Sequence, residues 1–323
     1  MNDTISVIIP IFNKSRFLRK ALRSIREQTY SDLEIICIDD ASTDNCFDAL
    51  SELALQDPRI KVFRNESNLG IYANRLVGIR HATGSYTAFA DADDLMSPQA
   101  LELMLKAMVK YDVDLVQMRA SRIMGKLKVK YNETFDPSLT DRRIEGEEYK
   151  DLTSYVGMTS YITPPCWNKL YKTQILKVLR HVPFNQFWGD DQIFNIPYLK
   201  AAQSMAFIDY IGYHYRWGGA TSRHYKYSAL RDYKEVHRIK LAMGLDPQYL
   251  NPEIITLLEY HIRQLHTERG WTWEAIRMVL EDELKDPFWQ RTGLQKSADE
   301  LIADAMNHVQ KNTFKYLVKR LLK

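Results

Sequence analysis

The first 118 residues of the chain alternate between short apolar runs and amphipathic stretches. The apolar runs are rich in β-branched residues and occupy residues 5–9, 33–38, 60–63 and 85–90. The stretches between them begin near Ser15, Phe47 and Ile71 and carry apolar residues at helical spacing. Strands that alternate with helices of this length form a mainly parallel sheet covered by helices. The sequence therefore predicts an α/β fold.

Acidic residues follow two of these predicted strands. Asp39 and Asp40 come after the second strand, and Asp91-Ala-Asp-Asp94 comes after the fourth, shortly before a predicted helix start at Ser97-Pro98. In parallel sheets of this kind, ligands bind beyond the carboxyl ends of the strands. Carboxylates gathered there need a compensating cation, and hard oxygen ligands suit Mg²⁺ or Mn²⁺. A solvated acidic turn is the alternative interpretation.

Composition excludes several classes of protein. The 323 residues are 45% hydrophobic and 26% charged, as in globular proteins, and we find no apolar run long enough to span a membrane. The N-terminus lacks the basic and apolar regions of a secretory signal, and the 3 cysteines cannot all pair within one chain, which favours a cytoplasmic protein. A net charge of +3 does not point to nucleic-acid binding.

The remainder of the chain differs in character from the first part. Residues 126–151 are polar and irregular, with an exposed hairpin strand expected at 126–130. Residues 155–225 are rich in aromatic residues, Pro and Gly, a composition that suits loops lining a cleft. From about residue 226 the pattern is helical and charged, without a strand-like run. We therefore predict a boundary near residue 225.

Four motifs together resemble one enzyme family. In order and spacing they are similar to family 2 glycosyltransferases with the GT-A fold: Ile5-Ser-Val-Ile-Ile-Pro-Ile-Phe-Asn13, Ile38-Asp-Asp-Ala-Ser-Thr-Asp44, Asn68-Leu-Gly70 and Asp91-Ala-Asp-Asp94. The resemblance covers about residues 4–220 and implies a catalytic domain at 1–225, with a nucleotide-sugar part at about 1–118 and an acceptor part at about 119–225, followed by a helical region at 226–323.

The resemblance implies an inverting, metal-dependent transferase. It would move a hexose or N-acetylhexosamine from a nucleotide sugar, expected to be UDP-linked, to a hydroxyl of a glycan or lipid-linked glycan acceptor. Synthesis of lipopolysaccharide, capsule or another surface polysaccharide is the expected setting.

The resemblance also assigns residues to the donor side. Phe12, where the family more often has a tyrosine, would stack on a uracil, and Asp40 would accept a hydrogen bond from the ring N–H of the base. A core Phe and a helix-capping Asp are the alternatives. Arg75 matches an arginine of the family, although Leu76 replaces the Asn that usually follows it. The other expected donor contacts are Pro10, Asn13, Asn68, Gly70 and Ala92.

The acidic cluster resembles the Asp-x-Asp motif of the family. Asp93 would ligate a divalent ion, Mn²⁺ or Mg²⁺, that bridges the two donor phosphates, and Asp91 would lie near the ribose and the metal. Such an ion neutralises charge on the departing nucleoside diphosphate. Asp94 would be structural. His214 is a further candidate neighbour of the metal, and a satisfied structural histidine is the alternative.

A second acidic pair, Asp190-Asp191, resembles the Glu-Asp motif of the family at a helix start. Transfer with inversion needs one base to take the proton from the acceptor hydroxyl, and Asp191 is the candidate for this role. Asp190 stands in for the usual Glu as a positioning residue. A helix N-cap is the alternative.

Three more residues are expected around the acceptor and the diphosphate. Trp167 offers a flat face to a sugar, with a packed core Trp as the alternative, and Lys169 could meet a phosphate or a carboxylate. Arg216 ends the segment Tyr213-His-Tyr-Arg216, which resembles a Tyr-x-Arg segment of the family that is expected to close over the diphosphate.

Residues 311–323 combine apolar residues at helical spacing with basic residues and no acidic one. A basic amphipathic helix can lie on an anionic membrane, which predicts peripheral contact with the inner face of the cytoplasmic membrane. A helix packed on residues 250–310, or a dimer contact, is the alternative. The oligomeric state stays open.

Other kinds of protein match the pattern less well. A haloacid-dehalogenase-like phosphatase carries Asp-x-Asp after its first core strand, whereas three predicted strands precede it here. A dinucleotide-binding dehydrogenase would need a Gly-x-Gly-x-x-Gly after a strand. The remaining alternative is a non-catalytic glycan- or nucleotide-binding protein on the same fold. The presence of both Asp93 and Asp191 argues against it, because binding alone needs no base.

Overall fold

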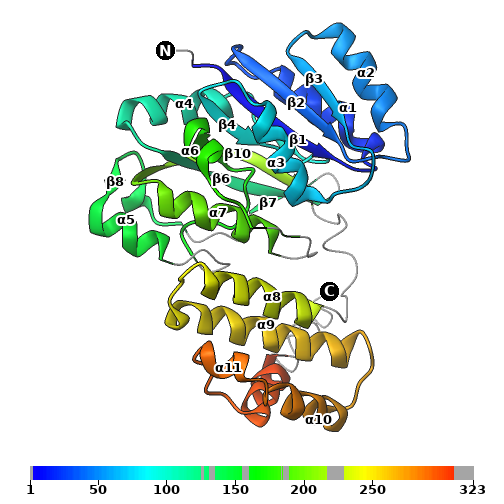
Figure 1. Ribbon diagram of the computed structural model, residues 1–323, viewed down its shortest axis with the longest axis vertical. Coiled ribbons are helices and arrows are strands. Elements are labelled where there is room, and N and C mark those ends of the chain that lie inside the picture. Colours follow the sequence, from blue (N-terminus) through cyan, green and yellow to red (C-terminus); the bar gives the residue numbers. More distant parts are fainter. Residues whose placement is uncertain are drawn as a thin grey trace, which may run out of the picture. The chain divides into compact units, whose positions relative to one another are not determined.

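Four parallel strands begin the central sheet, as the alternating pattern predicts (Figure 1). The computed structural model describes residues 3–124, 127–130, 135–154, 160–182, 184, 189–216 and 229–308. All residues of the first two strands are buried, as expected for parallel strands covered on both faces. The strands pair in the order β3-β2-β1-β4 and are β1 (Ile5–Ile11), β2 (Leu33–Asp39), β3 (Ile60–Arg64) and β4 (Tyr86–Phe89).

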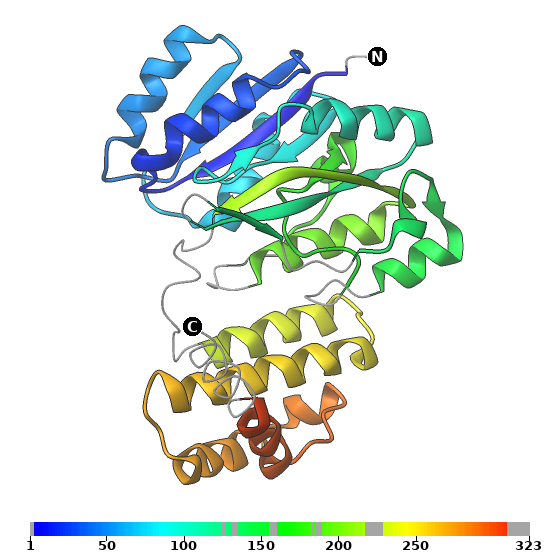
Figure 2. The same ribbon diagram turned by 180° about the vertical axis from the view of Figure 1, so that it is seen from behind.

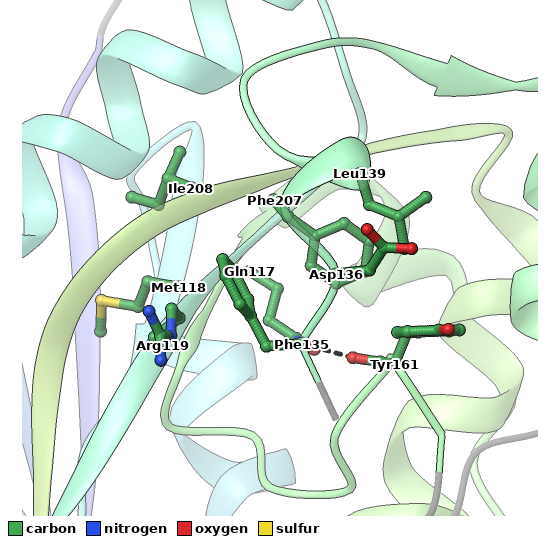
Figure 3. A pocket seen from close by; sticks show the side chains of 9 residues that line it. All are labelled: Gln117, Met118, Arg119, Phe135, Asp136, Leu139, Tyr161, Phe207 and Ile208. Carbon is green, nitrogen blue, oxygen red and sulfur yellow. Dashed lines mark hydrogen bonds between the residues drawn. The ribbon is translucent and has the colours of Figure 1, made fainter. Parts of the chain in front are cut away.

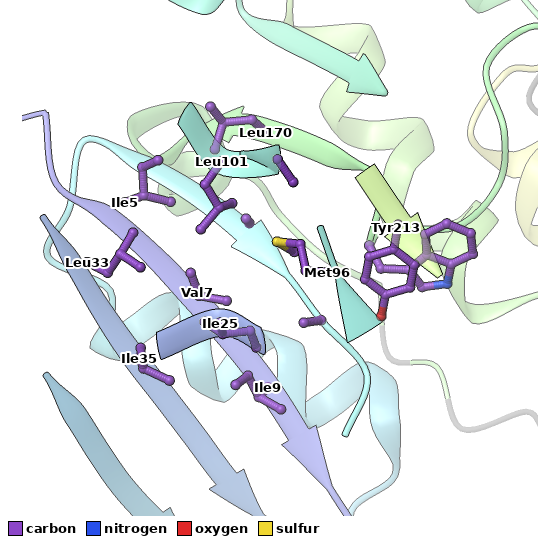
Figure 4. Close-up of a cluster of buried hydrophobic side chains, with 14 of the residues drawn as sticks. Ile5, Val7, Ile9, Ile25, Leu33, Ile35, Met96, Leu101, Leu170 and Tyr213 are labelled. Atoms are coloured by element: carbon purple, nitrogen blue, oxygen red, sulfur yellow. The ribbon is translucent and has the colours of Figure 1, made fainter. Parts of the chain in front are cut away.

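Helices cover both faces of these strands. On one face, Ile5, Val7 and Ile9 of β1 share a buried cluster with side chains of α1 (Ser15–Arg26), α2 (Cys46–Gln56) and α4 (Ala100–Tyr111) (Figure 4). On the other face, α3 (Ile71–His81) packs on β1 through Gly78, where an added Cβ would lie 2.3 Å from Cγ2 of Ile8. This close approach brings α3 against the sheet behind the predicted donor side.

The second half of the sheet is mixed. Its central path continues from β4 through β9 (Lys169–Lys172) and β6 (Leu115–Met124) to β10 (Ser204–Arg216) and β5 (Leu95–Met96). Strand β10 lies beside β6 (Figure 2) and runs parallel to it, whereas β9 is antiparallel to both of its neighbours. Off this path, β7 (Leu127–Lys130) pairs with β6 and confirms the hairpin strand predicted there, and β8 (Ile144–Glu145) pairs with β10.

The prediction of loops throughout residues 155–225 is wrong for much of this segment. It contains β9, β10, α6 (Thr173–Val178) and α7 (Asp190–Ala201), while η1 (Pro137–Leu139) and α5 (Gly146–Thr153) precede it. Several of the described aromatic residues that suggested a cleft are instead core residues. Tyr171 packs edge-on against Phe194 and Tyr198, and all three are fully buried.

By its contacts the chain divides into two units, residues 1–186 with 190–221 and residues 187–189 with 222–323. The boundary predicted near 225 lies outside the described residues. The second unit is helical, with no strand among its described residues, which confirms the predicted helical extension. It contains α8 (Ala229–Ala242), α9 (Pro247–Thr267), α10 (Trp273–Glu283) and α11 (Pro287–Arg291).

None of the described helices combines the length and the apolar character needed to cross a membrane. The tail predicted to lie on a membrane, residues 311–323, is outside the described residues.

Candidate active site

Arg75 connects the two predicted acidic motifs. It lies on α3 with its side chain fully buried. Its Nη1 is 2.5 Å from Oδ2 of Asp190, and its Nη2 is 2.9 Å from Oδ1 of Asp191, at the start of α7. Both terminal nitrogens of the guanidinium face these two carboxylates, and the predicted contact of Arg75 with the donor stays a prediction.

Carboxylates are concentrated around this guanidinium. Burial, with the negative charges of Asp191 and Asp93, raises the pKa of Asp91 to about 7, although Arg75 acts in the opposite direction. Burial and the neighbouring Asp191 likewise raise the pKa of Asp190 to about 6, again against Arg75. Burial therefore disfavours the ionised form of both carboxyl groups, and a cation bound nearby would favour it.

A divalent cation fits the carboxylates that follow β4. Asp93 keeps 14% of its side chain exposed, and the pKa of the neighbouring Asp91 is raised by burial and, to a smaller extent, by the negative charges of Asp191 and Asp93. Hard oxygen donors of this kind suit Mn²⁺ or Mg²⁺. Among the described residues, no group of three His, Cys, Asp or Glu side chains is placed to hold a metal ion by itself. Phosphate oxygens and water would have to complete the coordination shell.

Lys14 is a residue of this site that the sequence analysis missed. Its ammonium forms an ion pair with Oδ2 of Asp93. Arg216 lies on the same side of the site, where its Nε donates to the main-chain carbonyl of Asp93 at 2.8 Å and its backbone N–H donates to Oδ1 of Asp94 at 2.6 Å. The position of Lys14 directly after the Phe12-Asn13 motif was the signal available in the sequence.

Asp40 joins two of the sequence motifs. It is buried and accepts hydrogen bonds from the backbone N–H groups of Leu69 and Gly70, at 2.8 and 2.9 Å, and from Nδ2 of Asn65 at 2.8 Å. Asn68 completes the link, since its Nδ2 lies 3.5 Å from the Asp40 carbonyl. The carboxylate thus holds the Asn68-Leu-Gly70 segment against the end of β2.

Phe12 lies at the end of β1 with 43% of its surface exposed, which argues against the alternative of a core Phe. The neighbouring Asn13 has a positive φ of 52°, and its Oδ1 accepts a hydrogen bond from the backbone N–H of Thr43 at 2.8 Å. Asn13 therefore shapes the turn beside the exposed ring. Pro10 and Ala92, two other expected donor contacts, are buried next to the ends of β1 and β4.

Trp167 and Lys169 belong to the core of the first unit. The Trp167 ring is buried and stacks on Tyr213, with ring centroids 4.3 Å apart, and the Tyr213 hydroxyl accepts a hydrogen bond from the backbone N–H of Asp91 at 2.9 Å. Lys169 is fully buried, and its Nζ donates to the carbonyls of Thr163 and Pro165 at 2.6 and 2.7 Å. Carbonyl groups lie around the ammonium of Lys169, and its predicted phosphate or carboxylate partner stays a prediction.

His214 has hydroxyl partners in place of a carboxylate. Its Nδ1 is 2.7 Å from Oγ of Ser121, and its Nε2 is 2.9 Å from Oγ of Ser97. Burial and the nearby Lys128 lower the pKa of His214 to about 4. These contacts match the alternative of a structural histidine and give no support to a role beside the metal.

A small cavity lies elsewhere, along the middle of β6 and β10 (Figure 3). Its volume is about 20 Å³, room for roughly one water molecule, and its wall includes Gln117, whose Nε2 donates to the Tyr161 carbonyl at 2.9 Å. It shares no lining residue with the carboxylate site and is too small for a sugar.

Comparisons with known proteins identify the family. The family described as Glycosyl transferase family 2 matches residues 6–178, which include most of β1, all of β2 to β4 and the acidic residues that follow β2 and β4. Glycosyltransferase GlyA of Streptococcus pneumoniae is 29% identical over 181 residues, 56% of this chain and 26% of GlyA. An uncharacterized glycosyltransferase of Nostoc sp. is 34% identical over 193 residues, 58% of this chain and 56% of that protein. The chain thus spans less than two thirds of the length of either relative.

A solved structure shows the same fold. The crystal structure of Staphylococcus aureus TarS 1-349 in complex with UDP-GlcNAc matches with a TM-score of 0.63 at 17% identity, over 95% of this chain and 92% of TarS 1-349. The GT-A fold expected from the motifs is thereby confirmed. The motif set, the position of the acidic residues at the ends of the parallel strands and the family match over more than half of the sequence lead to one conclusion. This chain belongs to glycosyl transferase family 2.

Proposed function

We propose that this chain is an inverting, metal-dependent glycosyltransferase. It moves a hexose or N-acetylhexosamine from a UDP-sugar to a hydroxyl of a glycan or lipid-linked glycan in surface-polysaccharide or lipopolysaccharide synthesis. One observation carries the proposal: Arg75 holds the candidate base pair Asp190 and Asp191 in the same charged cluster as Asp91. Binding alone would not require a base next to the donor carboxylates.

On the donor side, the exposed ring of Phe12 offers a stacking face for the base. Asp40 holds the segment from Asn68 to Gly70 in place and has carboxylate lone pairs left for the ring N–H of a uracil. Asp93 and Asp91 would hold the divalent cation, which when bound neutralises charge on the departing UDP. Arg216, anchored on the Asp93 carbonyl, adds a positive charge on this side.

On the acceptor side, Asp191 takes the proton from the attacking hydroxyl. Its side chain is 26% exposed, so an acceptor can reach it, while Arg75 and the backbone N–H of Cys166, 3.4 Å from Oδ1, orient the carboxylate. The acceptor oxygen then forms its bond to the anomeric carbon as the bond from that carbon to the UDP oxygen breaks. Asp190 shares Arg75 with Asp191 and so positions the base.

The UDP-sugar is supported by the fold shared with TarS, whose structure contains UDP-GlcNAc. Action on surface glycans, a cytoplasmic location and peripheral membrane contact through residues 311–323 are part of the proposal and rest on the sequence motifs and the basic tail.

The test begins with thermal unfolding in Mn²⁺ with UDP, GDP, CDP or dTDP. We expect UDP to raise the melting temperature most, and the corresponding UDP-sugars to be hydrolysed or transferred. Chelation of divalent ions should stop turnover. Asp191→Asn should bind UDP normally and lose transfer by about a hundredfold or more. Transfer by Asp191→Asn within a few-fold of wild type would refute the base assignment, and UDP binding without any turnover of a donor panel would favour a non-catalytic protein.

A further inference from the structure

The carboxylate proposed to bind the metal already has a cationic partner. The ammonium of Lys14 pairs with Oδ2 of Asp93, and the two side chains are 28% and 14% exposed. The pair links the loop after β1 to the acidic motif after β4, both within the first unit. It therefore lies where a divalent cation would have to approach.

The backbone of Lys14 is held firmly, in contrast to its side chain. Its carbonyl accepts hydrogen bonds from the N–H groups of Phe17 and Leu18 at 2.9 and 3.0 Å, and its own N–H lies 3.2 Å from Sγ of Cys46. Lys14 is the N-cap residue of α1. Any displacement of the ammonium must therefore take place through the four-carbon side chain, which is long and flexible enough to move without unfolding the helix.

An ammonium and a divalent ion bound to the same carboxylate repel each other, so the two cations compete for the charge of Asp93. An ion that takes Oδ2 of Asp93 displaces the ammonium of Lys14, which then loses its counter-charge. A nucleoside diphosphate brings phosphate oxygens that can receive it. Without the diphosphate, a divalent ion that replaces Lys14 at Asp93 leaves the Lys14 ammonium without a negatively charged partner.

We propose that Lys14 is the resident counter-cation of Asp93, that it competes with the divalent ion for this carboxylate, and that it thereby makes metal binding depend on the nucleoside diphosphate. The inference rests on the proposed function, because it assumes that the metal binds at Asp93. Binding of metal and of UDP would then be coupled, each raising the affinity for the other by the same factor.

The test measures Mn²⁺ affinity by electron paramagnetic resonance of free Mn²⁺, with and without UDP. Lys14→Met should bind Mn²⁺ without UDP about fivefold more tightly than wild type, as expected for loss of a partly exposed ion pair. The gain in Mn²⁺ affinity produced by UDP should shrink in this variant. Lys14→Arg keeps the charge and should behave like wild type, as should Lys20→Met, an exposed lysine on the same helix.

Thermal unfolding of each variant shows whether it is folded, and Lys14→Gln serves as a second neutral variant if Lys14→Met is not. Unchanged or weaker Mn²⁺ affinity in a folded neutral variant, together with loss of Mn²⁺ binding in Asp93→Asn, would overturn the inference and leave the metal role of Asp93 standing. Wild-type Mn²⁺ binding by Asp93→Asn would overturn both.

Discussion

Nη2 of Arg75 lies 2.9 Å from Oδ1 of Asp191, so that a buried arginine holds the candidate base. Asp190 forms an ion pair with Nη1, the other terminal nitrogen of the same guanidinium. The two carboxylates at the start of α7 are thus positioned by a residue of α3. This relationship predicts that changes at Arg75 alter the chemical step more than they alter binding of the nucleotide.

Arg75→Lys should lower kcat by about a hundredfold, because a lysine presents one nitrogen where the arginine presents two, and a misplaced base loses its alignment. UDP affinity, measured by calorimetry, should stay close to that of wild type. Arg19→Lys, an exposed arginine paired with Glu52, is the matched control and should keep full activity. A raised KM for the donor with unchanged kcat would instead support the donor contact expected from the sequence.

Asp40→Asn should destabilise the first unit by about 1–3 kcal/mol and weaken UDP binding. The carboxylate accepts hydrogen bonds from Leu69, Gly70 and Asn65, and an amide nitrogen in place of one oxygen leaves a buried N–H without an acceptor. Denaturant unfolding and UDP titration provide the two measurements. Asp48→Asn, on the exposed side of α2, is the control. Equal stability of the two variants would show that the Asn68-Leu-Gly70 segment does not depend on Asp40.

The pH profile of transfer should show an acid limb, a fall in rate at low pH that is caused by protonation of Asp190. Burial and Asp191 raise the pKa of Asp190 to about 6, so this carboxylate takes up a proton at a higher pH than an ordinary aspartate, whose pKa is 3.8. As the pH falls through about 6, Asp190 loses the negative charge that pairs with Arg75, and kcat/KM should therefore fall. The measurement runs from about pH 5 to about pH 8. In Asp190→Asn the limb near pH 6 should disappear at a lower overall rate, and an unaltered limb would assign it to another group such as Asp91, whose pKa is raised to about 7.

Stability in acid should depend on Glu34 of β2. Burial alone would raise its pKa, but hydrogen bonds from Lys61, Ser6 and Thr83 outweigh this effect and lower the pKa of Glu34 to about 2, from 4.5. The ionised group therefore stabilises the fold at pH values above 4.5, and this contribution, about 2 kcal/mol, is lost as the pH falls from 4.5 toward 2.

Glu34→Gln should accordingly be less stable than wild type at neutral pH, and the difference should narrow in acid. Urea unfolding at a series of pH values measures this difference in the free energy of unfolding between Glu34→Gln and wild type. Glu27→Gln, whose side chain is 68% exposed, is the control. A difference between Glu34→Gln and wild type that stays constant with pH would mean that the carboxylate charge is not the source of the stability.

The sequence by itself determined the first half of the sheet and the edge at which the site forms. The strand pattern of β1 to β4 is local, and a parallel sheet brings the carboxyl ends of its strands together whatever the details of packing. For that reason the positions of Asp40 after β2 and of Asp91 to Asp94 after β4 were enough to place these carboxylates at the same edge of the sheet. Family motifs in the same segment were enough to predict both the fold and the family.

Only the tertiary structure decided which partners the long side chains have. Lys169 is buried among carbonyls, Arg75 faces the start of α7, and Lys14 faces Asp93, and each partner comes from a packing arrangement that no local pattern encodes. The aromatic residues of β9, β10 and α7 look alike in the sequence whether they line a cleft or fill a core. Pairing with distant strands placed them in the core, because burial of their rings stabilises the sheet only after those strands have come together.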